Sequence, residues 1–266
     1  MSILGNARKT EPLKLLIIGD SGTGKTWIIG TLCRYVPTLV VTADASGLDT
    51  FRQMGVDPDI VLIESWDNAW DALAEIKSYE GKSKALAIDD FGKVQERGVQ
   101  RVEGKPRGRD EERMRPDALS AMTRKGLVLG DRKMILPQFG EVAVASESFL
   151  YELLSTAFPI KVMTMLLETR EHPRTGQDAL YPALLGNIRY DILSRFSLVL
   201  NTFMERREAT TLFCATSRPH PRLGTKDRYS PGRTWVDPTA ERILAHIVGP
   251  DEHETPTETQ IGVGIH

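Results

Sequence analysis

The chain alternates between short apolar runs and longer stretches in which apolar residues recur every three or four positions. Runs of the first kind are typical of buried strands, and spacing of the second kind is typical of helices that pack on a sheet. Because the helical stretches separate the apolar runs, we expect βαβ crossovers, hence a mainly parallel α/β sheet with helices on both faces. The pattern predicts strands at residues 15–18, 38–42, 60–63, 84–88 and 160–167.

Helical spacing appears first after the opening strand, where it predicts a helix that ends at about Tyr35. A second helix is expected to begin at Ser65, because serine is a favoured helix cap. Trp66 and Trp70 recur in it at helical spacing with later apolar residues, so we expect both rings in the core. A longer helix is predicted at residues 142–158.

The later part of the chain changes its pattern. A polar loop is expected at residues 168–182, followed by a helix at 185–194. Apolar runs at 198–203 and 210–214 flank a short charged turn, which predicts an antiparallel hairpin. A last amphipathic helix is predicted at 240–248.

Both ends of the chain and one internal segment have few core residues. Residues 1–12 form a polar lead-in, and residues 250–266 form an acidic tail that is expected to be disordered. The remaining residues, 13–249, are enough for one domain with a sizeable core. From 92 to 133 charged residues replace the regular apolar spacing. A mobile loop is therefore expected there, interrupted by a helix at about 116–125.

The most informative stretch is an apolar run that breaks into a glycine-rich turn ending in Gly-Lys-Thr. It matches the phosphate-loop pattern G-x-x-x-x-G-K-[ST], with a strand before it and a helix after it. Glycines let the backbone curl until successive N–H groups converge on an anion, and the helix dipole adds to the attraction. Lys25 would serve the β and γ phosphates, and Thr26 would ligate Mg²⁺. The candidate nucleotide-binding residues are Gly19, Asp20, Ser21, Gly22, Thr23, Gly24, Lys25 and Thr26.

Acidic residues follow two of the other predicted strands. Asp89 and Asp90 come directly after the run at 84–88, and Asp44 follows the run at 38–42. The carboxyl ends of parallel strands share one edge of a sheet, so these residues are expected beside the phosphate loop. A metal that bridges the β and γ phosphates needs a carboxylate opposite the threonine, which makes Asp89 the candidate, although paired aspartates also end strands as turn formers.

The sequence offers several candidates for the general base that would activate water. Asp44 and Asp90 are the main candidates because both lie at strand ends, and Glu64 and Glu168 are further ones. Asp90 has a second interpretation, as the cap of the segment that follows it. The 5 histidines are scattered without ligand spacing, so they are interpreted as surface or structural residues.

Composition narrows the class of protein. A hydrophobic content of 41% and a charged content of 26% are ordinary for a soluble globular chain, and a formal charge of −2 indicates no global attraction to a polyanion. Cys33 and Cys214 lie far apart without a C-x-x-C motif, which favours reduced thiols over a disulfide scaffold or a zinc site. No apolar stretch is long enough for a bilayer, and no signal peptide is recognisable, so we expect a cytoplasmic protein with no membrane partner.

Local charge is nevertheless positive over residues 92–133, where 12 basic residues against 7 acidic ones give +5. A basic loop beside a nucleotide site can track a phosphate backbone, although charge runs are more often solvated faces. Arg170, Arg174 and Arg189, with Tyr181 between them, would add a stacking surface. Single-stranded DNA is therefore the expected partner.

Several segments, taken in order, resemble the RecA-like phage nucleotide-binding proteins, a group that includes ATPases of single-strand annealing and recombination. The resemblance covers about residues 13–230 and implies a RecA-type ATPase core that uses ATP and Mg²⁺. It also implies a homo-oligomer in which Lys226 and Arg228 form a K-x-R pair that reaches the γ phosphate of a neighbouring subunit. The segments are residues 19–26, Thr42-Ala43-Asp44-Ala45-Ser46-Gly47-Leu48, Ser65-Trp66, Ile88-Asp89-Asp90, Pro182-Ala183-Leu184-Leu185-Gly186 and Lys226-Asp227-Arg228.

The chain departs from this family in two places. Family members commonly have a carboxylate where this chain has Ala45, with Asp44 one position earlier, and the basic insertion at 92–133 is long for the family. Three functions remain as hypotheses: an ATP-dependent protein that handles single-stranded DNA, a small-molecule or nucleotide kinase, and a nucleotide-gated assembly or regulatory module with little turnover. A kinase would usually show an arginine-bearing lid and an acceptor pocket, which the sequence does not indicate.

Overall fold

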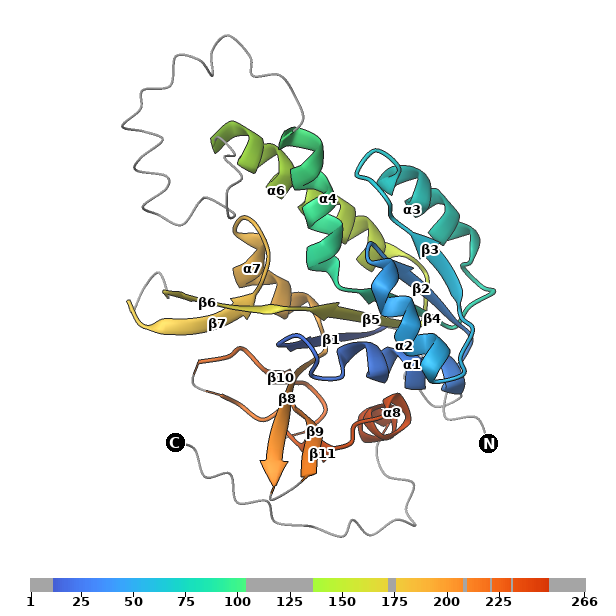
Figure 1. Cartoon of the computed structure of the whole chain (residues 1–266), viewed down its shortest axis with the longest axis vertical. Coiled ribbons are helices and arrows are strands. Elements are labelled where there is room, and N and C mark those ends of the chain that lie inside the picture. Colours follow the sequence, from blue (N-terminus) through green and yellow to red (C-terminus); the bar gives the residue numbers. More distant parts are fainter. Residues whose placement is uncertain are drawn as a thin grey trace.

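The computed structural model describes residues 12–103, 136–171, 176–207, 210–220, 222–230 and 232–248. Within these residues, nine strands form one sheet in the order β11-β9-β8-β1-β5-β4-β2-β3, with β10 paired to β8 (Figure 1). Neighbouring strands from β8 to β3 are parallel, whereas β9, β10 and β11 are antiparallel to their partners. The predicted α/β class, with a mainly parallel sheet and an antiparallel hairpin, is confirmed.

The strands of this sheet cover the apolar runs of the sequence. Their bounds are β1 (Leu13–Gly19), β2 (Thr38–Thr42), β3 (Asp59–Leu62), β4 (Ala85–Asp89), β5 (Ile160–Met165), β8 (Leu198–Arg207), β9 (Thr210–Thr216), β10 (Lys226–Asp227) and β11 (Thr234–Val236).

Helices cover both faces of the sheet (Figure 1). They are α1 (Lys25–Tyr35), α2 (Leu48–Gln53), α3 (Ala69–Ser78), α4 (Phe91–Glu103), α6 (Leu136–Ser155), α7 (Ile188–Asp191) and α8 (Ala240–Val248), with short 3₁₀ helices at Ala45–Gly47 and Ile192–Arg195.

Each face of the sheet has its own core because successive side chains of a strand point in opposite directions. On one face, Leu16 and Ile18 of β1 belong to a buried cluster with residues of α3, α4, α6 and α7. On the other face, Leu15 and Ile17 belong to a cluster with α1, α2 and α8. Burial on both faces explains why β1 is a continuous apolar run in the sequence.

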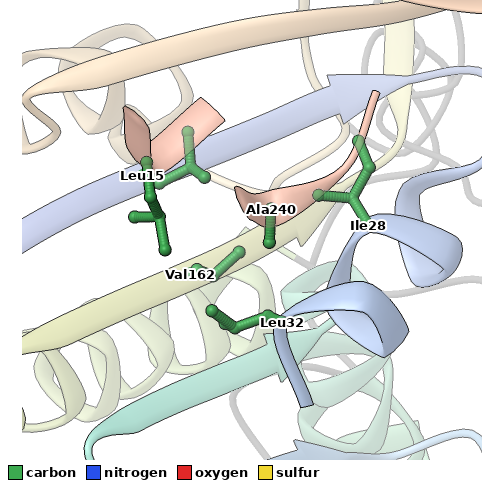
Figure 2. Close-up of a pocket in the computed structure, with 6 residues that line it drawn as sticks. Leu15, Ile28, Leu32, Val162 and Ala240 are labelled. Carbon is green, nitrogen blue, oxygen red and sulfur yellow. The ribbon is translucent and has the colours of Figure 1, made fainter. Parts of the chain in front are cut away.

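Helices α1 and α8 pack together over β1 and β5, and Figure 2 shows the side chains at this contact. They surround an apolar gap of about 10 Å³, which has room for about one water molecule. The gap is therefore a packing imperfection and not a ligand site. Its lining residues are Leu15, Ile28, Leu32, Val162, Ala240 and Leu244.

The helix expected from Ser65 begins later, at Ala69, with Asn68 as its N-cap residue. Ser65 instead lies in the preceding turn, where its N–H donates to Oδ1 of Asn68. Trp66 is buried as predicted, but Trp70 is 45% exposed, so its core assignment was wrong.

The mobile loop expected from residue 92 was wrong for its first part. Residues up to Glu103 belong to the helix α4. Phe91, Val94 and Val99 are buried at helical spacing along one side of α4. Glycine, glutamine and charged residues fill the positions between them, which hides the apolar stripe in the sequence. The expected helix at 116–125 lies outside the described residues, as do the lead-in up to residue 11 and the tail.

The polar segment at 168–182 is mostly a β-hairpin, not a loop. β6 (Leu167–Glu171) and β7 (Asp178–Pro182) pair antiparallel as a separate two-stranded sheet. The charged turn expected between β8 and β9 is also largely strand, because pairing continues to Arg207 and Thr210. The helix expected at 185–194 consists of α7 and the short 3₁₀ helix after it.

No helix within the described ranges is both long enough and apolar enough to cross a membrane.

Candidate nucleotide-binding site

The turn between β1 and α1 has the backbone that the glycine pattern predicts. Gly22 and Gly24 have φ angles of 76° and 87°, a region that other residues rarely adopt. Gly24 is also the N-cap residue of α1, which begins at Lys25. The turn therefore brings the positive end of a helix to the carboxyl edge of the sheet, where it can bind an anion.

Gly19 is needed for a different reason, which is close packing between β1 and β8. It pairs with Thr202 in the parallel register, and a methyl group on Gly19 would collide with Oγ1 of Thr202. The Thr202 hydroxyl lies 2.8 Å from Oγ1 of Thr23 and donates to the carbonyl of Ile18 at 3.2 Å. Thr202 therefore fixes the phosphate loop onto β8, a role that a lone strand threonine does not reveal in sequence.

Lys25 is directed into the loop. Its side chain is buried, and Nζ donates to the carbonyls of Gly19 and Asp20 at 2.9 and 2.7 Å. Burial lowers the pKa of Lys25, while Asp90, Asp89 and Asp20 favour its charged form. An ammonium group held at the turn by two backbone carbonyls places a positive charge where the loop can bind a phosphate.

Thr26 and Asp89 meet beside the loop. Oγ1 of Thr26 donates to Oδ2 of Asp89 at 2.9 Å, and Oγ1 of Thr164 donates to Oδ1 of Asp89 at 2.9 Å. Thr164 reaches this position because β5 lies between β1 and β4. Burial raises the pKa of Asp89, opposed by the hydrogen bonds from Thr164 and Thr26 and by the charge of Lys25.

These residues fit the predicted Mg²⁺ ion. Hydroxyl and carboxylate oxygens are the ligands that Mg²⁺ prefers, and Asp89 is only 7% exposed. A nearby cation stabilises the charged form of such a buried carboxylate. Neither here nor elsewhere in the described residues is a group of three or more His, Cys, Asp or Glu side chains arranged to hold a metal.

Asp90 is held in an uncommon conformation. Its φ angle is 60°, its N–H donates to Oγ1 of Thr164 at 2.7 Å, and its Oδ1 accepts from the N–H of Gly92 at 3.0 Å. Burial raises the pKa of Asp90 to about 6, and the neighbouring Asp89 contributes in the same direction. Asp90 therefore caps the start of α4 and has a pKa suited to general base catalysis near neutral pH.

Asp44 lies just beyond β2 and caps the short 3₁₀ helix at Ala45–Gly47. Its Oδ1 accepts from the N–H of Ser46 at 2.9 Å, and this hydrogen bond holds the pKa of Asp44 below its usual range. Thr42 joins the ends of β2 and β4, since its hydroxyl donates to the carbonyl of Asp89 at 3.3 Å. A carboxylate with a lowered pKa is a weaker base than one with a raised pKa, which favours Asp90 over Asp44.

The two other acidic candidates differ in their surroundings. Glu64 is exposed after β3. Glu168 accepts from Nε of Arg170 at 2.6 Å and from Nη1 of Arg189 at 2.8 Å, so both arginines are occupied by one carboxylate. Arg189 is also buried. The stacking surface expected from these arginines and Tyr181 therefore lacks free charges at those two positions, and Arg174 lies outside the described residues.

Lys226 and Arg228 lie near the opposite edge of the sheet from the phosphate loop. β10 pairs antiparallel with β8, and the N–H of Arg228 donates to the carbonyl of Ser197 at 3.2 Å. Ser197 in turn bonds to Lys14, at the start of β1. Five residue steps of β1 separate Lys14 from Gly19, about 17 Å at the usual rise of a strand.

That separation exceeds the reach of an arginine side chain, so Arg228 does not reach the phosphate loop of its own chain. Lys226 pairs with Val199, which is in register with Leu16, three residue steps or about 10 Å of strand from Gly19. Arg228 is exposed. Nζ of Lys226 donates to the carbonyl of Ser194 at 3.1 Å.

Part of the basic insertion lies on α4, where its charges already have partners in the protein. Lys93 pairs with Glu96 at 3.1 Å, Nη2 of Arg97 donates to the carbonyl of Ala43 at 2.8 Å, and Arg101 pairs with Asp67 at 2.7 Å. The remaining basic residues of the insertion lie outside the described residues.

The strand order and the site together define the class of protein. The phosphate loop follows β1, the strand that ends in Asp89 lies two positions away in the parallel sheet, and antiparallel strands complete the other side. This is an α/β protein in which a phosphate-loop turn lies at the carboxyl edge of a mainly parallel sheet.

No model of a known protein family matches the chain. Among solved structures, it resembles the flagellar accessory protein FlaH from Methanocaldococcus jannaschii, with a TM-score of 0.38 and 10% identity over 85% of this chain and 87% of that one. It also resembles a KaiC-like protein from Pyrococcus horikoshii, with a TM-score of 0.39 and 15% identity over 84% of this chain and 88% of that one. Likenesses this weak say nothing about what the chain binds or does.

Proposed function

We propose that this chain binds and hydrolyses ATP and acts on single-stranded DNA in recombination or replication. The observation that carries the ATP part is the contact between Thr26 and Asp89, at 2.9 Å, beside a buried Lys25. A glycine turn that only connected a strand to a helix would need neither a buried ammonium nor a carboxylate held against its threonine.

Each part of the chemistry has a candidate among the described residues. The loop backbone and Lys25 would hold the phosphates, and Thr26 and Asp89 would hold Mg²⁺. When bound, Mg²⁺ neutralises charge on the β and γ phosphates. Asp90 accepts the proton of the attacking water, with Asp44 as the alternative base, and Thr164 orients Asp89 and the backbone of Asp90.

The direct test incubates the purified protein with ATP and Mg²⁺, with and without single-stranded DNA, and measures ADP and free phosphate. We expect both products in equal amounts and a higher rate with DNA. Lys25→Ala should abolish turnover, whereas Lys82→Ala, which removes an exposed lysine, should leave it unchanged. ADP without free phosphate would point to a kinase, and activity retained in Lys25→Ala would contradict the assignment.

A nucleotide-gated module with little turnover is the second candidate, and one feature favours it. Asp44 and Asp90 both accept backbone N–H groups in the turns that they cap. These bonds also suit a purely structural role, in which binding would change assembly without hydrolysis. ATP-dependent assembly measured by light scattering, together with no detectable release of phosphate, would support this alternative.

We further propose that the protein works as a homo-oligomer in which Lys226 and Arg228 contact the nucleotide of a neighbouring subunit. Their position supports this, because Arg228 is about 17 Å and Lys226 about 10 Å of strand away from the loop of their own chain. A strictly monomeric protein with full activity at every concentration would contradict the proposal.

The DNA part of the proposal rests on the basic insertion, mainly on residues outside the described ranges. Binding driven by phosphate contacts weakens steeply with salt, so a triple replacement of Arg107, Arg109 and Arg113 should flatten the salt slope by up to about three units. A triple replacement of Arg52, Lys77 and Lys82, which are basic residues on the surface of other elements, is the matched control. Equal slopes in the wild type and the insertion variant would assign the loop to another partner.

A further inference from the structure

The β8–β9 hairpin extends beyond the edge of the sheet where the phosphate loop lies. β8 accompanies β1 as far as Thr202, which pairs with Gly19, and then continues to Arg207. Because side chains alternate along a strand, Met204 lies on the same face as Thr202. Thr202 contacts Thr23 of the loop, so the face that carries Met204 is turned toward the nucleotide site.

Phe213 of β9 is paired with Met204 and shares this face. Its ring lies against the loop, since a methyl group on Gly24 would be 3.5 Å from Cδ1 of Phe213. Phe213 is 41% exposed and Met204 is 51% exposed. Neighbouring large apolar side chains that stay exposed indicate a binding surface more strongly than single scattered ones do.

Trp27 adds a third exposed apolar side chain on the same side of the loop. It directly follows Thr26 and is 48% exposed. One helical turn later, Thr31 accepts a hydrogen bond from the N–H of Ala240 at 2.8 Å, so this side of α1 faces the start of α8. The carbonyl of Phe213 accepts from the N–H of Asp237, three residues before Ala240. Trp27 and Phe213 therefore both approach the segment at 237–240.

The metal end of the loop points away from these side chains. Thr26 contacts Asp89 of β4, and the order β8-β1-β5-β4 places that contact on one side of β1 and the hairpin on the other. If the β and γ phosphates of a nucleotide lie toward Asp89, the α phosphate and nucleoside have the β8–β9 side of the loop open to them.

We propose that Phe213 stacks on the nucleobase, with Met204 and Trp27 flanking the ring. This inference rests on the proposed binding of ATP by the phosphate loop and adds the residues that recognise the base. Stacking is favourable for every base because each has a π face, and the larger purine ring covers more apolar surface than a pyrimidine does. The site should therefore prefer ATP to CTP.

The test distinguishes the contribution of the base to binding from that of the phosphates. It measures the affinities of ATP, CTP and inorganic tripolyphosphate in the presence of Mg²⁺. Phe213→Ala should weaken ATP binding by about tenfold, within the range for loss of one stacked ring, and should leave tripolyphosphate binding unchanged. The preference for ATP over CTP should shrink in the same variant. Phe213→Tyr keeps a ring and should restore the affinity for ATP.

Trp70→Ala is the matched control, because Trp70 is an aromatic residue of similar exposure, 45%, on the distant helix α3. It should change neither affinity. If Phe213→Ala unfolds, Met204→Ala is an independent check. It should weaken the affinity for ATP by less than Phe213→Ala would and leave the affinity for tripolyphosphate unchanged. Equal losses for ATP and tripolyphosphate, or none for either, would overturn the assignment of the base site. Failure of the wild type to bind both ligands would instead contradict the phosphate loop itself.

Discussion

Thr26 and Asp89 are 63 positions apart in sequence, and their side chains meet at 2.9 Å. The contact joins the first residues of α1 to the last residue of β4 across the intervening strand β5. A hydroxyl and a carboxylate held together at this point offer the oxygen pair that a Mg²⁺ ion on a bound triphosphate requires.

Replacing Asp89 by asparagine should reduce hydrolysis far more than nucleotide binding. The substitution keeps the volume and removes the charge that balances the metal, so we expect the turnover rate to fall by about 100-fold or more. Turnover and the affinity for ATP should be measured across a range of Mg²⁺ concentrations. Unchanged turnover would mean that Asp89 is only a turn former and that another acid holds the metal.

Thr164→Val tests how Asp89 is held. The hydroxyl of Thr164 donates to Asp89 at 2.9 Å and accepts from the N–H of Asp90 at 2.7 Å, and valine has nearly the same shape without these bonds. Loss of a group that orients a metal ligand typically costs about 10- to 100-fold in metal affinity or activity. We expect a higher Mg²⁺ requirement and lower turnover, with Thr156→Val as a control at another buried threonine. An unaltered Mg²⁺ requirement would show that Asp89 needs no such support.

The parts of the fold that sequence predicts are those set by local pattern. β1, β2 and β4 are buried on both faces, so their residues form uninterrupted apolar runs. α4 was missed because its buried stripe is diluted by charged residues, and β6 and β7 were missed because a hairpin outside the main sheet has no long apolar run. Trp70 shows the reverse error, since helical spacing alone cannot tell a half-exposed ring from a core ring.

The candidate site likewise has a part that the local sequence predicts and a part that only the tertiary structure reveals. The phosphate loop is contiguous and carries its own backbone requirements, so sequence places it correctly, down to the positive φ angles of Gly22 and Gly24. Thr164 and Thr202 come from strands whose neighbours are decided by the sheet order. A single threonine at the end of an apolar run has no local signal, so only the tertiary structure reveals these two residues.

Arg228→Ala tests whether adjacent subunits share a site. The variant should bind ATP normally. If Arg228 acts as an arginine finger, the rate of ATP hydrolysis should fall by about 10³-fold or more. Mixing it with Lys25→Ala should restore part of the activity, because a mixed oligomer contains some interfaces with an intact loop and an intact arginine. Arg233→Ala, which changes another arginine in the same part of the chain, is the control. No recovery at any mixing ratio, in oligomers shown to be mixed, would argue against shared sites.

The residue between Lys226 and Arg228 gives a prediction about stability and pH. The side chain of Asp227 is 3% exposed and accepts hydrogen bonds from His246 at 2.9 Å and from Ser217 at 2.8 Å. Burial alone would raise the pKa of Asp227, but these bonds, with those from the backbone N–H groups of Tyr229 and Ser230, hold it below its usual value. Asp227 thereby ties β10 and its flanking residues to α8.

A carboxylate with a lowered pKa stabilises the fold above its unfolded pKa, near 3.9 for aspartate, and loses that contribution as the pH falls through its folded value. Asp227→Asn should therefore lower the free energy of unfolding by about 1–3 kcal/mol at pH 7, the usual cost of disturbing buried hydrogen bonds to a charged group. The gap between wild type and variant should narrow below about pH 4. Urea unfolding of both proteins at pH 7, 5 and 3.5 measures this, with Asp59→Asn at the exposed start of β3 as the control. A gap that stays constant down to pH 3.5 would show that the charge of Asp227 contributes nothing and that only its shape matters.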